Sequence, residues 1–440
     1  MASQQFEPPS GTRDFLAADL RVRERVFSAI REVYERYGFE PLQTPAFERL
    51  ETLTGKYGDE GDKLIFKILR RGEHEASGET DLALRYDMTV PLARVVAAYG
   101  FRLPGPYKRY VMGPVWRAER PGRGRFREFA QCDVDVVGTT SPLADAEVVC
   151  AAADALDAVG VRDVSVLVNS RRALAGLLEA YGIPPGSGAG VLITLDKLDK
   201  LAPDAVADEL AEARSVDPDT AKHLVSDLTA DDVVERVRAR LAGTGEGRAG
   251  LAEVDRMVEL AAPVVGGERI AFTPRLARGL DYYTGAIFEF AAAGVPGSIG
   301  GGGRYDHLIE ALGGPDMPAC GVSLGIERII GLAGDDAGAV QRLDVAVTVM
   351  DDGAARDAME FAAPLRRAGL RTEVYLGSNR KLARQLKWAA GRQARVTLIE
   401  GEQERAVGVV TVRDMDSGEQ QRVPRDQLTV LLRGKLAAAR

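Results

Sequence analysis

Five arginines lie close together in one short segment of the chain. They are Arg117, Arg120, Arg123, Arg125 and Arg127, with Glu119 and Glu128 among them. A guanidinium group is planar, stays charged and can bind phosphate oxygens through two parallel hydrogen bonds. The segment therefore predicts a clamp for a triphosphate or for RNA. A solvated turn with surface ion pairs would have the same composition, so the cluster alone does not decide between the two.

The residues that follow alternate between polar and apolar. In a strand, alternate side chains point to opposite faces. One face would carry Phe129, Gln131, Asp133 and Asp135, and the other Ala130, Cys132, Val134 and Val136. An amide and two carboxylates on one face suit a sheet that lines a substrate cavity, although an antiparallel sheet with one solvated face shows the same alternation.

Two later segments also carry polar groups near glycines. Residues 278–285 read Arg-Gly-Leu-Asp-Tyr-Tyr-Thr-Gly, and Gly300–Gly303 are followed by Arg304, Tyr305 and Asp306. A glycine run allows close backbone approach to a ligand, but without a strand-turn-helix context it is weak evidence for phosphate binding. A flexible segment is the plainer explanation of such a run, and close approach to a ligand is the other.

The residue inventory restricts the chemistry further. The chain contains only three histidines and three cysteines, and none are spaced as zinc ligands or as a redox pair. We therefore expect no protein-bound zinc, and catalysis by carboxylates, arginines, tyrosines and backbone groups. No apolar stretch approaches the roughly 20 residues of a membrane span, and the N-terminus lacks a secretory signal, so we expect a cytoplasmic protein.

Charge is divided unevenly along the chain. The whole sequence has a net charge of −8, but residues 341–440 contain 18 Lys+Arg against 13 Asp+Glu, a net charge of +5. A mildly basic end on an acidic body suggests local contact with a polyanion, and a solvated basic face is an equally ordinary explanation.

Several elements must position these residues. Apolar residues at three-to-four spacing predict a helix over Leu20–Tyr37, ended by Gly38, and the prolines within Phe39–Phe47 favour an extended edge segment. Tyr107–Arg117 and Arg127–Val137 predict an antiparallel hairpin around the loop Ala118–Phe126.

The rest of the chain alternates in type. Residues 141–160 and 170–265 are helical in pattern, strands are expected at Ala286–Phe290 and Cys320–Leu324, and a helix begins near Gly325. A linker at Gly331–Gly338 precedes strands at Leu343–Met350, Arg371–Leu376 and Arg395–Ile399 that alternate with helices. This alternation predicts a small α/β domain with a largely parallel sheet. At 440 residues, two or three domains are expected.

The segments, taken in order, resemble a known family. The strand around Pro45, the hairpin from Arg117 through Gln131, and Gly321-Val-Ser-Leu-Gly-Ile-Glu-Arg328 resemble the three signature motifs of class II aminoacyl-tRNA synthetases. Residues 278–285 and 84–91 (Leu-Arg-Tyr-Asp-Met-Thr-Val-Pro) resemble stretches peculiar to histidyl-tRNA synthetases. The similarity extends from about Pro9 to the C-terminus.

The resemblance implies an architecture. Residues 1–168 and 266–334 would form an α+β catalytic domain with an antiparallel sheet, residues 169–265 a helical insertion domain, and residues 341–440 an α/β anticodon-binding domain. It also implies a homodimer.

The resemblance implies roles for individual residues. Arg117 and Arg278 would be catalytic, with Arg278 over the reacting carboxylate and α-phosphate. ATP would be bound by Arg117, Glu119, Arg125 and Arg328. Histidine would be bound by Asp87, Met88, Thr89, Arg117, Gln131, Asp135, Arg278, Tyr282 and Tyr283, of which Asp135 and Tyr283 would read the imidazole ring. In the C-terminal domain, Asn379, Arg380, Lys381, Arg384 and Lys387 would form a basic stripe on the second helix that contacts tRNA(His).

The implied substrates are L-histidine, ATP and tRNA(His), with Mg²⁺ bound mainly through the phosphates of ATP. Asp87 and Asp135 stand where many bacterial members carry glutamate, and the hairpin reads Arg-Ala-Glu-Arg-Pro, so the chain looks more like the eukaryotic and archaeal branch. His307 stands where glycine is usual.

Two other functions fit parts of the sequence. A catalytically silent, histidine-sensing regulatory paralogue would resemble the catalytic domain alone, but such proteins tend to lack Arg278, the arginine hairpin and the C-terminal domain. A class II synthetase for another amino acid would share the three motifs, and the segment 278–285 speaks against it.

Overall fold

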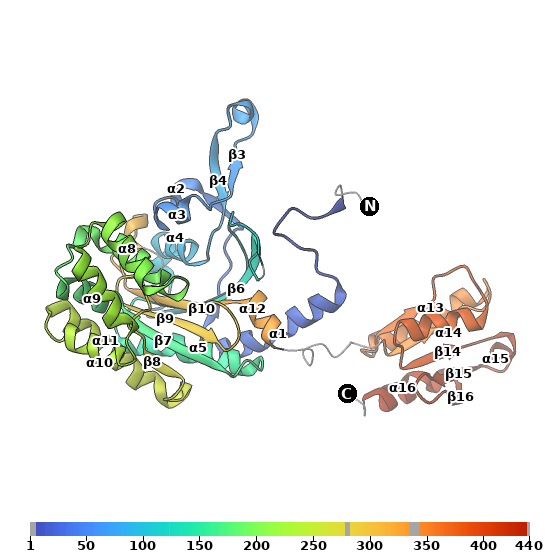
Figure 1. Cartoon of the computed structure of the whole chain (residues 1–440). Helices are drawn as coiled ribbons and strands as arrows, with labels where there is room; N and C mark the ends of the chain where they lie inside the picture. Colours follow the sequence, from blue (N-terminus) through green and yellow to red (C-terminus); the bar gives the residue numbers. More distant parts are fainter. Residues whose placement is uncertain (1–5, 123, 278–281, 334–342, 438–440) are drawn as a thin grey trace. The chain divides into compact units, whose positions relative to one another are not determined.

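The computed structural model describes residues 6–122, 124–277, 282–333 and 343–437. The chain divides into two compact units, Met1–Gly338 and Ala339–Arg440 (Figure 1). The first contains an eight-stranded and a three-stranded sheet, the second contains a five-stranded sheet, and each unit has its own apolar core.

An eight-stranded sheet forms the centre of the first unit. Its strands, in spatial order, are β1 (Glu40–Pro41), β5 (Tyr107–Trp116), β6 (Glu128–Val137), β11 (Ala319–Gly325), β10 (Ser298–Arg304), β9 (Ala286–Ala292), β7 (Val164–Ser170) and β8 (Ile270–Phe272). The six central strands pair with one another in antiparallel orientation, and the edge strands β1 and β8 pair in parallel with β5 and β7. The predicted antiparallel sheet and the predicted β5–β6 hairpin are confirmed.

Two helices cover the apolar face of this sheet. Helix α1 (Ala17–Arg36) buries Val26, Ile30 and Val33, and it ends before Gly38, whose φ of +76° suits glycine. Helix α5 (Pro142–Ala158) begins after Ser141, whose hydroxyl accepts the Leu143 N–H. Both helices pack with the apolar residues of β6 in one core. The opposite face of β6 is therefore left for polar residues.

The helical segment lies between β7 and β8. Its helices are α6 (Arg171–Ala180), α7 (Gly188–Leu195), α8 (Pro203–Arg214), α9 (Pro218–Thr229), α10 (Val233–Leu241) and α11 (Gly245–Val265). Their buried residues belong to the same continuous core as the sheet and α5. The proposed domain boundaries at 168/169 and 265/266 remain predictions.

A smaller sheet stands beside the main one (Figure 1). It contains β2 (Phe47–Arg49), β4 (Thr80–Leu84) and β3 (Lys67–Leu69), and the helices α2 (Leu50–Leu53), α3 (Gly58–Asp62) and α4 (Thr89–Tyr99) accompany it. Residues 85–88, which connect β4 to α4, carry one of the predicted site carboxylates, Asp87.

The glycine run is a strand and not a flexible segment, so the plainer of the two explanations was wrong. Gly300–Gly303 form most of β10, which pairs with β9 on one side and β11 on the other. A Cβ on Gly302 would lie 2.0 Å from the carbonyl oxygen of Gly321 on the neighbouring strand. Glycine is needed here because the backbones approach so closely.

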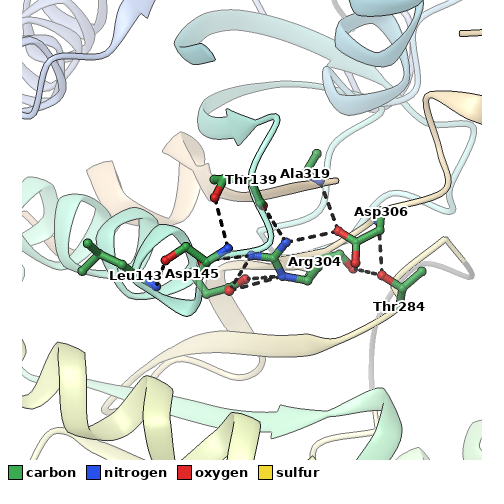
Figure 2. A network of polar contacts seen from close by, with 8 residues as sticks. Thr139, Leu143, Asp145, Thr284, Arg304, Asp306 and Ala319 are labelled. Carbon is green, nitrogen blue, oxygen red and sulfur yellow. Dashed lines mark hydrogen bonds and ion pairs between the residues drawn. The ribbon is translucent and has the colours of Figure 1, made fainter. Parts of the chain in front are cut away.

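A buried ion-pair network fixes the end of β10 (Figure 2). The Arg304 guanidinium donates to both carboxylate oxygens of Asp145 at the start of α5, and Nη1 also reaches the Thr139 carbonyl at 3.0 Å. Asp306 accepts from Arg304, and its own N–H donates to the Thr284 hydroxyl at 3.1 Å. Thr284 directly follows Tyr283, so the network anchors the segment that carries the predicted site tyrosines.

The second unit is a small α/β fold. Its sheet order is β13 (Thr372–Val374), β12 (Val345–Val347), β14 (Val396–Ile399), β15 (Val409–Asp414) and β16 (Gln420–Pro424). Its helices are α13 (Ala354–Arg367), α14 (Leu382–Gly391), α15 (Glu402–Ala406) and α16 (Leu428–Ala437). The three predicted strands are parallel, as expected, while the antiparallel strands β15 and β16 were not predicted.

The predicted linker, Gly331–Gly338, falls mostly outside the described residues. Its first residues belong to the end of α12 (Ile326–Leu332).

Candidate active site

A cavity of about 460 Å³ opens on the polar face of the eight-stranded sheet. Strands β6, β9, β10 and β11 form its floor, and the β5–β6 loop and the first residues of α4 and α12 contribute to its walls. Ten residues predicted from the sequence line it together: Asp87, Thr89, Arg117, Glu119, Arg125, Gln131, Asp135, Tyr282, Tyr283 and Arg328.

Two predicted residues are not in this group. Arg278 lies outside the described residues. Met88 is buried, and its side chain packs with Val111 and Val115 instead of lining the cavity. Its backbone carbonyl accepts a hydrogen bond from Arg109 at 3.0 Å.

The predicted alternation along β6 is confirmed. Phe129, Gln131, Asp133 and Asp135 all line the cavity. Ala130, Cys132, Val134 and Val136 lie in the core beneath it. The strand therefore separates an apolar core from a polar pocket.

Asp135 is held by both of its carboxylate oxygens. Its Oδ2 lies 2.7 Å from Nη2 of Arg109, and its Oδ1 accepts a hydrogen bond from the Tyr305 hydroxyl. Burial raises the pKa of Asp135, while Arg109 and the Tyr305 hydrogen bond act in the opposite direction. A Cβ on Gly321 would lie 2.0 Å from Oδ1, so glycine on β11 makes room for this carboxylate.

Asp87 is a second buried carboxylate with defined partners. The hydroxyls of Tyr57 and Tyr282 each donate to it at 3.1 Å, and so does the backbone N–H of Val90. Burial raises its pKa, and these hydrogen bonds together with Arg117 oppose the rise. Tyr282 also packs edge-on against Tyr283 and Tyr305, which gives the pocket an aromatic wall.

Asp133 is a third buried carboxylate in the cavity wall. Its Oδ1 has no hydrogen-bond partner among the described residues, and it lines the cavity. Burial raises the pKa of Asp133 to about 7; Arg109 lowers it and Asp135 raises it. The sequence had placed Asp133 on the polar face without assigning it a role.

The titration of Asp133 predicts a pH-dependent stability. Because its pKa is about 7 in the folded protein and 3.8 as the ordinary value, the folded state binds the proton more tightly between these values. The free energy of unfolding is therefore expected to fall as the pH rises from about 4 to about 7. Asp133→Asn removes this contribution, so its melting temperature relative to the unsubstituted protein should rise by a few degrees between about pH 5 and pH 8.

Thermal unfolding of both proteins without ligand, followed at several pH values, measures this difference. Asp87 and Asp135 are present in both proteins, so their own titrations largely cancel. A difference in melting temperature that stays constant over this range would contradict the pKa assigned to Asp133.

Arg117 is oriented by its neighbours at the end of β5. Its Nε donates to the Tyr86 carbonyl at 3.2 Å, and its guanidinium lies 4.4 Å from the centre of the Tyr86 ring and 5.2 Å from that of Phe129. The two terminal nitrogens are the atoms that can bind a pair of phosphate or carboxylate oxygens.

The hairpin loop is a tight turn with an exposed cation. Arg125 N–H donates to the Gly122 carbonyl at 2.9 Å, and Gly124 between them has a φ of +71°. The Arg125 side chain is 60% exposed and lies 3.7 Å from Glu119. The Arg125 side chain can therefore turn toward a ligand, and this movement would break only an exposed ion pair, which contributes little free energy.

The start of α12 is tied to three other parts of the unit. Glu327 accepts from Arg13 at 2.5 Å, from Arg23 at 2.8 Å and from the Ala130 N–H at 3.1 Å. The adjacent Arg328 donates to the Ser298 carbonyl at the start of β10. These contacts place Arg328 in the wall of the cavity, as predicted.

The predicted basic stripe lies at the start of α14. Arg384 and Lys387 are on the helix, whereas Arg380 and Lys381 precede it and Lys381 caps it. Lys381, Arg384 and Lys387 are exposed. Arg380 is half-buried and pairs with Asp352 at 2.8 Å.

Metal ligands are sparse in the described part of the chain. The only group of three potential ligands found there is His307, Glu310 and Asp316, all exposed and none lining the cavity. The three cysteines are buried and unbridged. Within the same residues, no helix is both long and apolar enough to span a bilayer.

The sequence also matches known families directly. The family model described as Histidyl-tRNA synthetase matches residues 11–329, and the model described as Anticodon binding domain matches residues 344–435. The chain belongs to the histidyl-tRNA synthetase family. The first match contains the whole cavity, and the second contains the basic stripe.

Curated relatives cover nearly the whole chain. The histidine–tRNA ligase of Gloeobacter violaceus is 41% identical, over 97% of this chain and 98% of the relative. That of Paracoccus denitrificans is also 41% identical, over 94% of this chain and 90% of the relative. The placement of this histidyl-tRNA synthetase in a particular branch of the family remains a prediction.

Solved structures share the fold. The crystal structure of histidyl-tRNA synthetase from a Nostoc species superimposes with a TM-score of 0.77 at 30% identity, covering 98% of this chain and 99% of the other. A Bacillus halodurans protein described as an ATP phosphoribosyltransferase regulatory subunit/histidyl-tRNA synthetase has a TM-score of 0.71 at 21% identity, over 87% of this chain and 96% of the other. The second likeness concerns the fold alone.

Proposed function

We propose that the protein activates L-histidine with ATP to histidyl-adenylate and transfers the histidyl group to the 3′-terminal adenosine of tRNA(His), releasing diphosphate and AMP. One observation carries the proposal. The guanidinium groups of Arg117 and Arg328 line the same cavity as the buried carboxylates Asp87 and Asp135. Such a cavity can bind an anionic nucleotide and a cationic amino acid side by side.

In the first step, a carboxylate oxygen of histidine attacks the α-phosphorus of ATP, and the bond from phosphorus to the diphosphate oxygen breaks. No protein nucleophile is required. The catalytic contribution is orientation and positive charge around the five-coordinate phosphorus. Arg117 supplies this charge, and Arg278, placed by family resemblance alone, would supply more.

The ATP roles follow from family position and agree with the cavity wall. Arg117 and Arg125 would hold the α- and γ-phosphate regions, Glu119 would face the adenine, and Arg328 would bind the triphosphate. Mg²⁺ would be held mainly through the phosphate oxygens, where it would offset the charge of the leaving diphosphate. Glu289 on β9 adds a carboxylate to the cavity wall, and oxygen donors of this kind suit Mg²⁺.

The histidine roles divide between two ends of the pocket. Asp87, Thr89 and Gln131 would hold the amino and carboxylate groups, and Asp135 and Tyr283 would read the imidazole ring, with Tyr282 beside them. A site that pairs the ring nitrogens leaves buried groups unpaired with any other amino acid, which can discriminate by about 10⁴ or more.

In the second step, a ribose hydroxyl of the terminal adenosine attacks the carbonyl carbon of the mixed anhydride. The ester bond forms, the bond from the carbonyl carbon to the phosphate oxygen breaks, and AMP leaves, with the hydroxyl proton passing to its phosphate group or to solvent. Arg380, Lys381, Arg384 and Lys387 of the second unit would contact the tRNA backbone. A homodimer and a cytoplasmic location belong to the same proposal, and both rest on the family resemblance.

Histidine-dependent exchange of labelled pyrophosphate into ATP tests the function, with the other amino acids as a panel. We expect exchange with histidine at least about 10³-fold above that with any other amino acid. Exchange with a different amino acid would make the protein a synthetase of other specificity. No exchange with any amino acid would favour the regulatory paralogue, for which the second unit at residues 344–435 has no evident use.

A further inference from the structure

Arg109 carries a fully buried charge on β5, the strand next to β6 in the floor of the cavity. Its exposure is 0%, and it lies near the start of β5. Removing a guanidinium from water costs several kcal/mol, and the cost is recovered only when the charge is well paired. We therefore expect the Arg109 guanidinium to have an anionic partner and a functional role.

Strand register supplies the partner. Arg109 on β5 stands directly opposite Asp135 on β6, and Asp135 stands opposite Gly321 on β11. Directly opposed side chains on one face are close enough to interact, and Nη2 of Arg109 lies 2.7 Å from Oδ2 of Asp135. The glycine on the other side leaves that flank of the carboxylate open.

Arg109 is not bonded like the structural arginines of this unit. Arg304 uses three nitrogens to contact Asp145, Asp306 and backbone carbonyls, and Arg85 donates to the carbonyls of Pro114 and Thr44. Arg109 makes both of its contacts, to Asp135 and to the Met88 carbonyl, through Nη2. Its Nε and Nη1 have no hydrogen-bond partner among the described residues. Few of its donors therefore stabilise the fold, whereas its charge acts on two buried carboxylates of β6, Asp135 in direct contact and Asp133 from further away.

The carboxylate it contacts is fixed at both ends. Tyr305 donates to Oδ1 of Asp135, and Arg109 forms an ion pair with Oδ2, which accepts no hydrogen bond among the described residues. Each carboxylate oxygen can accept two hydrogen bonds, so both retain an acceptor site for a ligand. Asp133 lies two residues away on the same face, and two buried carboxylates so close would otherwise favour protonation of one of them. Arg109 is the cation that opposes this.

We propose that Arg109 is a positioning residue that sets the specificity for the imidazole ring, by keeping Asp135 ionised and in one orientation so that it accepts a ring N–H. This inference deepens the proposed function and rests on it. A protonated or rotated Asp135 would present a donor in place of an acceptor, and the ring would lose its partner while ATP binding stayed intact.

The test compares Arg109→Met, Arg109→Lys, Asp135→Asn and the double variant Arg109→Met/Asp135→Asn in the full chain, by pyrophosphate exchange. We expect Arg109→Met to raise the KM for histidine about 30- to 100-fold, with kcat and the KM for ATP changed less than about threefold. Arg109→Lys, which keeps a charge, should recover part of the loss. The double variant should be no worse than Asp135→Asn alone, because Arg109 acts through Asp135.

Arg94→Met is the matched control. Arg94 makes a bidentate pair with the buried Glu48, at 2.7 Å for each contact, and neither residue lines the cavity. It should lower the melting temperature without a selective change in the KM for histidine. The double variant removes both buried charges, so it remains measurable if Arg109→Met is too unstable to purify.

The outcomes distinguish a failure of the role proposed for Arg109 from a failure of the proposed function. Losses that multiply in the double variant, or a KM for histidine that Arg109→Met and Arg109→Lys leave unchanged in an active enzyme, would overturn the role of Arg109 alone. Absence of histidine-dependent exchange in the unsubstituted protein would overturn the proposed function, and the inference with it.

Discussion

Replacing Arg117 by alanine is expected to lower kcat for histidine-dependent pyrophosphate exchange about 10³-fold, equivalent to about 4 kcal/mol of transition-state stabilisation. Arg117 is oriented by the Tyr86 carbonyl and by the rings of Tyr86 and Phe129. A preorganised cation aimed at developing charge contributes most in the transition state. The KM values for ATP and histidine should therefore change much less, by about tenfold at most.

Arg120→Ala is the matched control for this prediction. Arg120 belongs to the same loop, but it is exposed and does not line the cavity. Its loss should leave kcat within about twofold. Equal losses in the two variants would mean that the loop needs only its general positive charge, and the catalytic role of Arg117 would have to be given up. Circular dichroism of both variants shows whether the fold is retained.

The β5–β6 hairpin shows how far sequence reasoning could reach. Alternation and turn residues are local signals, and they predicted both strands and the four cavity-facing residues of β6 correctly. The role of Arg109 was not predicted, although the register of the predicted hairpin implies its position opposite Asp135. Trp116 pairs with Glu128 at the end of the hairpin, and counting back from that pair places Arg109 opposite Asp135.

Other features depend on contacts that no local pattern contains. Gly300–Gly303 were expected to be flexible because a glycine run has no side chains to signal a strand. They form the strand β10 by pairing with β9 and β11, and the backbones of these two neighbours leave no room for a Cβ at Gly302 and Gly303. Tyr57 and Tyr305 were missed for a similar reason, since each reaches a site carboxylate from a separate part of the chain.

In the sheet of the second unit, too, some strands were predictable from local patterns and others were not. Its three parallel strands were predicted from strand-helix alternation, which is a strong signal. Strands β15 and β16 follow a short helix and pair antiparallel at the edge. Gln420–Pro424 is polar and mostly exposed, with Val423 alone buried, so its sequence resembles a loop. Its pairing partner, not its composition, makes it a strand.

Removing the second unit, by ending the chain at Gly338, is expected to lower kcat/KM for tRNA charging at least about 10³-fold while leaving pyrophosphate exchange within about threefold. The cavity is built entirely from the first unit, and so is the core around it. Residues 341–440 carry a net charge of +5, whereas the rest of the chain is strongly acidic. Without the basic unit, a polyanion would meet mostly repulsive charge.

A charge reversal in the full chain tests whether the stripe at α14 is the part that matters. Changing Lys381, Arg384 and Lys387 to glutamate should raise the KM for tRNA at least about tenfold and weaken its salt dependence, because fewer phosphates are neutralised. Arg356→Glu on α13 is the control, since the Arg356 side chain is 86% exposed and forms an ion pair with Glu360 on its own helix. If the truncated protein lost pyrophosphate exchange as well as tRNA charging, the first unit would not be sufficient for histidine activation, and the prediction would be wrong. If the control weakened tRNA binding as much as the triple variant, the unit would bind through its overall charge, and the stripe would have no special role.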